Sequence, residues 1–93
     1  MAKIFVAQYQ SQADATVCQV QYESQADLKW CEVDYASQAS GDENWYFVEH
    51  ESQADFKIYW VNHESQADIK VYKVQYQSQT GWQTSNRFRS RIG

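Results

Sequence analysis

The sequence predicts an all-β fold: a compact closed sheet built from six or seven strand-turn repeats of about 13 residues each. Two observations predict it. The tetrapeptide Ser-Gln-Ala-Asp recurs at a nearly constant interval, which is the sequence signature of repeat architectures. Between the copies, strand-forming residues alternate with polar ones at a period of two. A small solenoid would share this pattern, and the period alone does not distinguish a hairpin meander from a wound topology.

The repeat occurs six times. Four copies are complete, at Ser11–Asp14, Ser24–Asp27, Ser52–Asp55 and Ser65–Asp68. Two are altered, to SQAS at Ser37–Ser40 and to SQTG at Ser78–Gly81. Successive serines lie 13, 13, 15, 13 and 13 residues apart, so residues 1–93 form one domain of near-identical units. Positions within a unit are counted from its serine, which is position 0.

The residues before each serine are expected to form a strand. Positions −6, −4 and −2 read aromatic or Cys, then Val or Ala, then Tyr or His, and they fall on one strand face because they are two apart. Positions −7 and +4 lie on the opposite face and are also apolar, so we expect burial on both sides at the start of each strand and on one side at its end. The expected strands are Lys3–Gln10, Ala15–Glu23, Leu28–Tyr35, Asn44–Glu51, Phe56–Glu64 and Ile69–Gln77.

Each tetrapeptide is expected to form a single helical turn between strands. A long helix is not expected, because the residues that follow alternate with period two. The Ser hydroxyl and Asp carboxylate would bond to the turn's own backbone N–H groups, and the Gln side chain to neighbouring backbone. Such turns need no Pro, and the chain has none. The residues assigned this structural role are Ser11, Gln12, Asp14, Ser24, Gln25, Asp27, Ser37, Gln38, Ser52, Gln53, Asp55, Ser65, Gln66, Asp68, Ser78 and Gln79.

Two segments depart from the repeat. In the third unit Ser40 replaces Asp, and two extra residues follow within Gly41–Asn44; we expect this longer loop to be the most mobile part of the domain. After the last turn, Trp82 is expected to pack, and residues 83–93 form a polar, basic tail. The tail could be a seventh strand or a loose arm.

The recurring order is Tyr or His, one variable residue, SQAD, a hydrophobic residue, Lys and a hydrophobic residue. Tyr22–Trp30 and His63–Tyr72 contain it, and the chain closes the series with Ser78–Trp82. From Ile4 to Trp82 this pattern resembles the small bacterial septoil knot domain, a family of SQAD-repeat proteins. The resemblance implies a backbone threaded into a deep seven-crossing torus knot, an exception to the rule that connections do not thread.

The family has no established biochemical activity, so the resemblance implies no functional residues. This sequence departs from the pattern at Ser40 with its two-residue insertion, and at His50 and His63, where the other units have Tyr. These departures affect local geometry only.

Charge and composition exclude several classes of partner. A net charge of −4 disfavours nucleic-acid binding, which depends on Lys and Arg. No stretch approaches the about 20 apolar residues of a membrane span, and Met1–Gln10 contains no signal-peptide core. Two Cys without a signal peptide are expected to be free thiols in a reducing compartment. We therefore expect a cytoplasmic monomer without nucleic-acid or membrane partners.

Cys18 and Cys31 at position −6, with His50 and His63 at position −2, share a predicted strand face and could form a zinc site. Their spacing matches no zinc-finger pattern, and each replaces an aromatic residue in a packing position. The Asp residues of the turns could likewise form a carboxylate ring for calcium, but repeat-borne calcium sites usually have Gly-rich turns. Core packing and turn capping are therefore favoured, and no metal or cofactor is expected.

The chain has no nucleophile elbow, phosphate loop or zincin motif. We therefore expect a non-enzymatic, very stable structural or protein-interaction module, with a metal- or small-ligand-binding domain as the alternative. Phe47 and Trp60 at position −5 could form an exposed apolar patch for a protein partner. Arg87, Arg89 and Arg91 could add a basic surface to it, or form a solvated tail that balances the acidic body.

Overall fold

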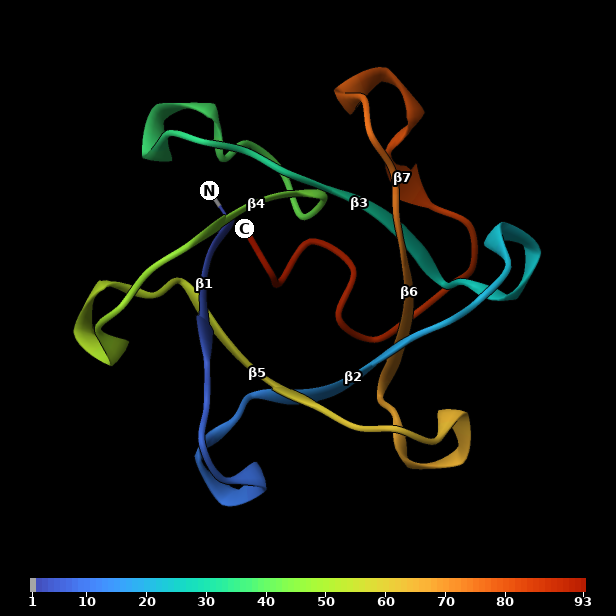
Figure 1. Ribbon diagram of the computed structural model, residues 1–93, viewed down its shortest axis with the longest axis horizontal. Helices are drawn as coiled ribbons and strands as arrows, with labels where there is room; N and C mark the ends of the chain where they lie inside the picture. Colours follow the sequence, from blue (N-terminus) through green and yellow to red (C-terminus); the bar gives the residue numbers. More distant parts are fainter. Residues whose placement is uncertain (1) are drawn as a thin grey trace.

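The computed structural model describes residues 2–93, in which strands alternate with short 3-10 turns (Figure 1). The strands are β1 (Ala2–Val6), β2 (Ala15–Gln19), β3 (Leu28–Glu32), β4 (Asn44–Phe47), β5 (Phe56–Trp60), β6 (Ile69–Lys73) and β7 (Gly81–Trp82). The turns are η1 (Gln10–Gln12), η2 (Glu23–Gln25), η3 (Ala36–Gln38), η4 (Glu51–Gln53), η5 (Glu64–Gln66) and η6 (Gln77–Gln79). The predicted all-β repeat class is confirmed. Within the described part of the chain, no helix has the length and apolar character needed to cross a membrane.

Six parallel strands close into a barrel. Their order is β4-β1-β5-β2-β6-β3, and pairing of β3 with β4 completes the ring. The short strand β7 pairs antiparallel with the first half of β3, at Leu28 and Lys29. In Figure 1 the six turns project outward around the ring, and the segment after β7 crosses its centre toward the N-terminus.

The chain goes round the ring twice. The strands β1, β2 and β3 form the first circuit, and each strand of the second circuit lies between two strands of the first. Consecutive strands therefore do not pair with each other, except β3 with β4. This order excludes a hairpin meander and produces the wound arrangement that the period alone left open.

The strands are shorter than the sequence predicted, although their starts agree to within one residue. Each strand is shifted by two residues against its neighbour, so that position −7 pairs with position −9 or −5, as in Ile4 with Phe56 and Ile4 with Phe47. The shift leaves an overlap of only a few residues. The backbone N–H at position −4 makes the last ladder bond, for example from Val20 to the carbonyl of Val71 at 2.9 Å, and the chain then leaves the sheet.

The core lies on the strand face that contains positions −9 and −7. The opposite face, with positions −6, −4 and −2, was expected to be buried as far as the Tyr or His at its end. The side chains that fill the barrel are those at positions −9 and −7, which face inward, together with Ile92. The predicted burial of position −2 is wrong, because this residue lies beyond the last ladder bond, at the start of a projecting turn. The four tyrosines there are 60–67% exposed: Tyr9, Tyr22, Tyr35 and Tyr76.

The Asp residues of the complete repeats fasten one unit to another. In each case the carboxylate accepts a hydrogen bond from a strand residue of a distant unit, and the Asp N–H donates to the carbonyl of that same residue. Asp27 does this with Lys70, at 2.9 and 2.7 Å. The equivalent pairs are Asp14 with Lys57, Asp55 with Lys3 and Asp68 with Thr16. The expected bond within the turn is replaced because the turn lies beside a neighbouring strand whose end N–H needs an acceptor.

The third-unit loop is an anchor rather than the mobile segment expected. Asp42 is 6% exposed, and its carboxylate accepts hydrogen bonds from the indole N–H of Trp82 at 2.9 Å and from the backbone N–H groups of Ser90, Ile92 and Gly93. The tail therefore folds across one end of the barrel. The longer loop supplies Asp42, a buried carboxylate that the tail's free backbone donors need.

Candidate functional site

The two ends of the barrel differ. The end lined by position −9 is covered by the tail: Ile92 is 1% exposed, and the ring of Phe88 meets that of Phe56 at 5.8 Å. The other end is lined by the last inward-facing residue of each strand, at position −5. We call this set the open rim; its members are Val6, Gln19, Glu32, Phe47, Trp60 and Lys73.

The open rim has an apolar half and a polar half. Strand order places Phe47, Val6 and Trp60 side by side on β4, β1 and β5. It places Gln19, Lys73 and Glu32 side by side on β2, β6 and β3. Val6 is 42% exposed, and Lys73 forms an ion pair with Glu32 at 3.1 Å. Phe47 and Trp60, which were predicted to form an apolar patch, therefore lie on the same half of the rim, with Val6 between them.

Aromatic packing supports the apolar half from inside the barrel. The rings of Trp30 and Trp45 stack at 4.3 Å. Phe47 meets Trp30 edge-on at 5.8 Å, and Trp60 lies 6.4 Å from Trp30. Phe47 and Trp60 are thus half-buried, with one side on the core and one side toward solvent. Contacts of this kind fix the rings in place before any partner binds.

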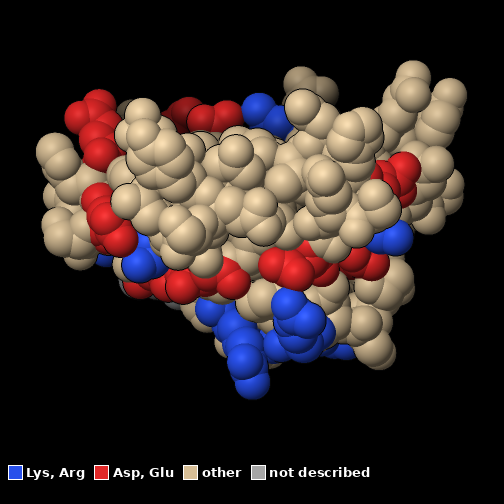
Figure 2. All heavy atoms as spheres, turned by 90° about the horizontal axis from the view of Figure 1, so that it is seen from below, with Lys and Arg blue, Asp and Glu red and all other residues tan. Residues whose placement is uncertain are grey.

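The arginines do not join this surface. Arg87, Arg89 and Arg91 are exposed on the tail, at the opposite end of the barrel from the open rim. Arg87 pairs with Asp68 at 3.0 Å and lies 4.9 Å over the ring of Phe88. Figure 2 shows basic side chains gathered on one face of the disc, bordered by acidic ones. The partner surface predicted from the sequence is therefore two separate surfaces.

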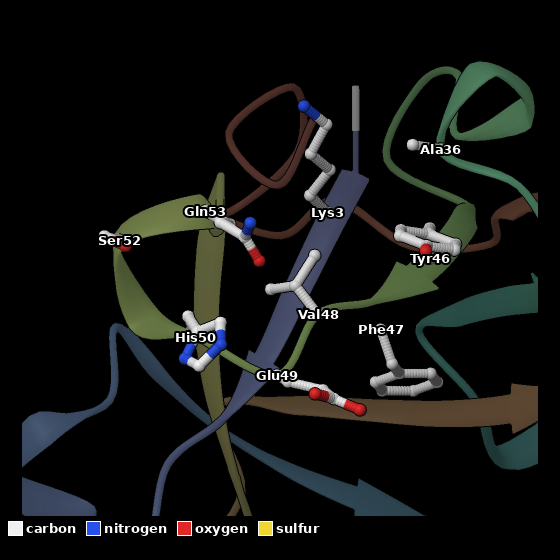
Figure 3. Close-up of a pocket in the computed structure, with 9 residues that line it drawn as sticks. All are labelled: Lys3, Ala36, Tyr46, Phe47, Val48, Glu49, His50, Ser52 and Gln53. Atoms are coloured by element: carbon white, nitrogen blue, oxygen red, sulfur yellow. The ribbon is translucent and has the colours of Figure 1, made fainter.

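Two equivalent grooves lie beside the fourth and fifth turns, and we call them the His grooves. The first, of about 720 Å³, lies between η3 and η4, and its lining includes Tyr46, Val48, His50 and Gln53. The second, of about 470 Å³, lies between η1 and η5, and its lining includes the same positions of the next unit: Tyr59, Val61, His63 and Gln66. In Figure 3, His50 and Gln53 lie on one side of the first groove and Tyr46 on the other, with Val48 between them.

The exchange of Tyr for His accounts for these grooves. In the units with Tyr at position −2, the small apolar residue at position −4 is buried: Ala7, Val20, Val33 and Val74. In the two units with His it is half-exposed, at Val48 and Val61. The smaller imidazole leaves uncovered the apolar surface that a phenol ring shields. The sequence showed the exchange, but its effect was missed because position −2 was assigned to the core.

The thiols and imidazoles considered as a metal site do not form one. Cys18 and Cys31 are free and buried, whereas His50 and His63 are exposed on the turns. Burial, and less strongly the Glu64 carboxylate, raises the pKa of the Cys18 thiol. Burial also raises the pKa of Cys31, with Lys73 opposing it. Raised pKa values keep both thiols protonated and unreactive. Across residues 2–93, no three His, Cys, Asp or Glu side chains are grouped as metal ligands would be.

The Ser and Gln residues of the turns have unused hydrogen-bonding groups. All are exposed, and the backbone N–H of each Gln bonds to the carbonyl of the Tyr or His three residues earlier. Within residues 2–93 none of the six Ser hydroxyls is hydrogen-bonded, and the one bonded Gln side chain is Gln38, which accepts from the N–H of Tyr35 at 3.3 Å. The expected bond from a turn Gln side chain to neighbouring backbone is therefore made at Gln38, and at none of the other five turn Gln residues in the described chain. Apolar core positions vary among units, whereas these exposed residues do not.

A family model described as the 7(1) septoil knot domain matches residues 1–83. The chain belongs to the septoil knot domain family. The resemblance seen in the repeats is thereby confirmed. Comparison with curated proteins and with solved structures finds no match to this chain. In this septoil knot domain, the matched residues include the open rim and both His grooves, whereas most of the tail held by Asp42 lies beyond them.

Proposed function

We propose that this septoil knot domain is a non-enzymatic protein-interaction module that binds a partner at the apolar half of the open rim. The observation behind the proposal is the contiguous set Phe47, Val6 and Trp60 at an uncovered barrel end. Exposed apolar groups gathered in one place, with polar groups beside them, are typical of protein contact sites. The best nucleophiles of the chain are thiols that burial keeps protonated, which favours binding over catalysis.

The partner would insert an apolar side chain between Phe47 and Trp60. Aromatic rings already held by a core lose little conformational entropy on binding, and such residues dominate binding energy at interfaces. Polar groups of the partner would lie against Gln19, Glu32 and Lys73. Removal of one central contact at such a site typically costs about 1–2 kcal/mol of binding energy, or roughly five- to thirtyfold in affinity.

The test uses Val6→Gln. Alanine at Phe47 or Trp60 would also remove packing on Trp30 and Trp45, so it would mix lost stability with lost binding. Val6 is the most exposed of the three, and the equivalent position of the second unit already holds Gln19. The variant should therefore melt close to the wild type. Gln21→Ala, a change at an exposed residue outside the apolar half of the rim, serves as control.

Wild-type, Val6→Gln and Gln21→Ala proteins are immobilised, and captured proteins are quantified by mass spectrometry. We expect a protein that both wild type and Gln21→Ala capture and Val6→Gln loses. Equal capture by Val6→Gln, or no protein enriched over blank resin, would contradict the proposal.

A further inference from the structure

We propose that the two His grooves are paired subsites for a neutral oligosaccharide. This is a function beyond protein binding at the open rim. Its polar residues lie outside the rim, whereas Phe47 and Trp60 line both the rim and the grooves. The apolar lining of each groove includes a tyrosine and a half-exposed valine, Tyr46 with Val48 and Tyr59 with Val61. The side is formed by an imidazole and a primary amide, His50 with Gln53 and His63 with Gln66.

This combination fits a sugar ring. A sugar presents C–H groups on its faces and hydroxyls around its edge, so aromatic and aliphatic side chains in the lining bind the face. Imidazole and amide groups both donate and accept hydrogen bonds, which matches hydroxyls. The turn fixes these two groups together: the N–H of Gln53 bonds to the carbonyl of His50 at 3.0 Å, and that of Gln66 to His63 at 3.0 Å. Side chains three residues apart in a 3-10 turn lie on the same side.

The polar groups of the grooves are not occupied by the fold. No hydrogen bond to another described residue involves the side chains of His50, Gln53, His63 or Gln66, and all four are exposed. A ligand therefore gains their bonds without breaking any. Exposed aromatic residues combined with small polar and amide side chains are also the composition that antibodies use for adaptable recognition.

The charge of the grooves favours a neutral ligand. The lining of the second groove has no Lys, Arg, Asp or Glu, and its polar groups are Gln10, Asn62, His63 and Gln66 besides Tyr59. The first groove has one of each sign, Lys3 and Glu49. Against a net charge of −4, neither groove offers the cluster of cations that a phosphate or an acidic polymer needs.

The duplication favours a chain of sugar units over a single one. The same groove occurs twice on one ring, with the turns η4 and η1 between the two copies (Figure 1). When one ligand reaches both subsites, the second binding step is intramolecular, so weak contacts combine into a higher overall affinity. The length of the ligand would then set its affinity, because a monosaccharide fills one groove only.

The test uses named neutral polysaccharides: laminarin, dextran, galactomannan and hydroxyethyl cellulose. Binding is followed by affinity electrophoresis and by chemical-shift changes of backbone amides in NMR spectra. We expect one of the four to retard the wild-type protein and to shift the amides of the fourth and fifth turns. The corresponding monosaccharide should bind at least about tenfold more weakly, as loss of one subsite implies.

Two double variants identify the grooves. Gln53→Ala with Gln66→Ala removes two exposed, unbonded amides, and should weaken binding by about tenfold without a change in melting. His50→Tyr with His63→Tyr restores the residue of the other units, should cover Val48 and Val61, and should abolish binding. The matched control for the first variant is the double change of Gln25 and Gln79 to Ala, on turns that retain Tyr.

Three results would overturn the proposal: no retardation by any of the four polysaccharides, equal loss in the control variant, or binding that survives the two His→Tyr changes. Capture of a protein that the groove variants lose and Val6→Gln retains would assign the grooves to a protein ligand instead. Val6 lies outside both grooves. A negative result in the polysaccharide experiments therefore does not contradict the open-rim proposal, and a negative result with Val6→Gln does not contradict the proposal for the grooves.

Discussion

Replacing Asp42 by Ala should release the tail and leave the barrel folded. The carboxylate is the shared acceptor for the indole N–H of Trp82 and for the backbone N–H groups of Ser90, Ile92 and Gly93. Without it, these donors have two options. They remain in place without an acceptor, or the tail leaves the barrel and water takes the place of the carboxylate.

The magnitudes favour release. The bond from the Ile92 N–H is buried and the other three are part-buried. Loss of the acceptor therefore costs about 1–3 kcal/mol at Ile92 and less at each of the other donors, which water can reach. Release of the tail loses the burial of Ile92, about 1.5–3 kcal/mol, and the contact between Phe88 and Phe56, about 0.5–1.5 kcal/mol. Each freed residue also regains about 1–2 kcal/mol of backbone entropy. We therefore expect Asp42→Ala to cost about 3 kcal/mol, which lowers the Tm by about 12–24 °C in a domain of this size.

Trypsin measures the release directly, because the tail contains Arg87, Arg89 and Arg91. In the wild type these residues are exposed, but two of them are held in turns by bonds from Arg89 to Asn86 and from Arg91 to Phe88. Asp42→Ala should be cut there first, giving a folded fragment that mass spectrometry identifies. Asp42→Asn keeps one acceptor oxygen, so its rate of cleavage should lie between those of the wild type and Asp42→Ala. The control is Asp34→Ala, a change at an exposed carboxylate. Cleavage at the wild-type rate, or loss of the whole fold with no folded fragment, would refute the reasoning.

Two further predictions concern single carboxylates. Asp27→Ala should lower the free energy of unfolding in urea by about 1–3 kcal/mol. Asp27→Asn should leave it nearly unchanged, because an amide can still accept a hydrogen bond from Lys70 and donate one to Thr84. Equal effects of Asp27→Ala and the exposed Asp34→Ala would contradict the role of Asp27 in joining two units. Burial, and then the charge of Asp42, raises the pKa of Glu43. A raised carboxyl pKa means that ionisation opposes folding above the unfolded pKa, so Glu43→Gln should raise the Tm at pH 7 and lose that advantage as the pH falls below about 4.5. A Tm gain in Glu43→Gln that persists at low pH would contradict the assignment.

The sequence predicted the parts of the fold that depend on neighbours along the chain. Period-two alternation located the strand starts, for example at Leu28 and Ile69. The change from alternation to SQAD located each turn without Gly or Pro. The burial of Trp30 and Trp45 followed from their place among the inward-facing residues. Local chemistry decides these features, so one sequence is enough to read them.

The remaining features depend on how units meet in space. The exposure of Tyr22 was missed because the two-residue shift between strands, which ends the ladder before position −2, is a property of the closed barrel. The bond from Lys70 to Asp27 joins residues 43 positions apart. Asp42 was assigned to a mobile loop because its four donors come from the far end of the chain. The alternation of apolar and polar residues predicts which residues share a strand face, but it does not predict where the hydrogen bonds between strands end.

The departures from the repeat at positions −2 and −5 break the sixfold similarity of the ring. Six equal units would give six equal outer faces and a uniform rim. The two exchanges of Tyr for His and the two aromatic residues at position −5 all fall in the fourth and fifth units. These units are consecutive in sequence, and their strands lie on either side of β1, so the double winding brings Phe47 and Trp60 together at the rim. The turns η4 and η5, which follow the two His residues, lie on either side of η1 (Figure 1). Packing alone does not require this coincidence, because Gln19 and Lys73 fill the equivalent rim positions and Tyr fills the equivalent turn positions elsewhere. A few departures on a frame of equal parts are the arrangement expected when the frame provides stability and the departures provide recognition.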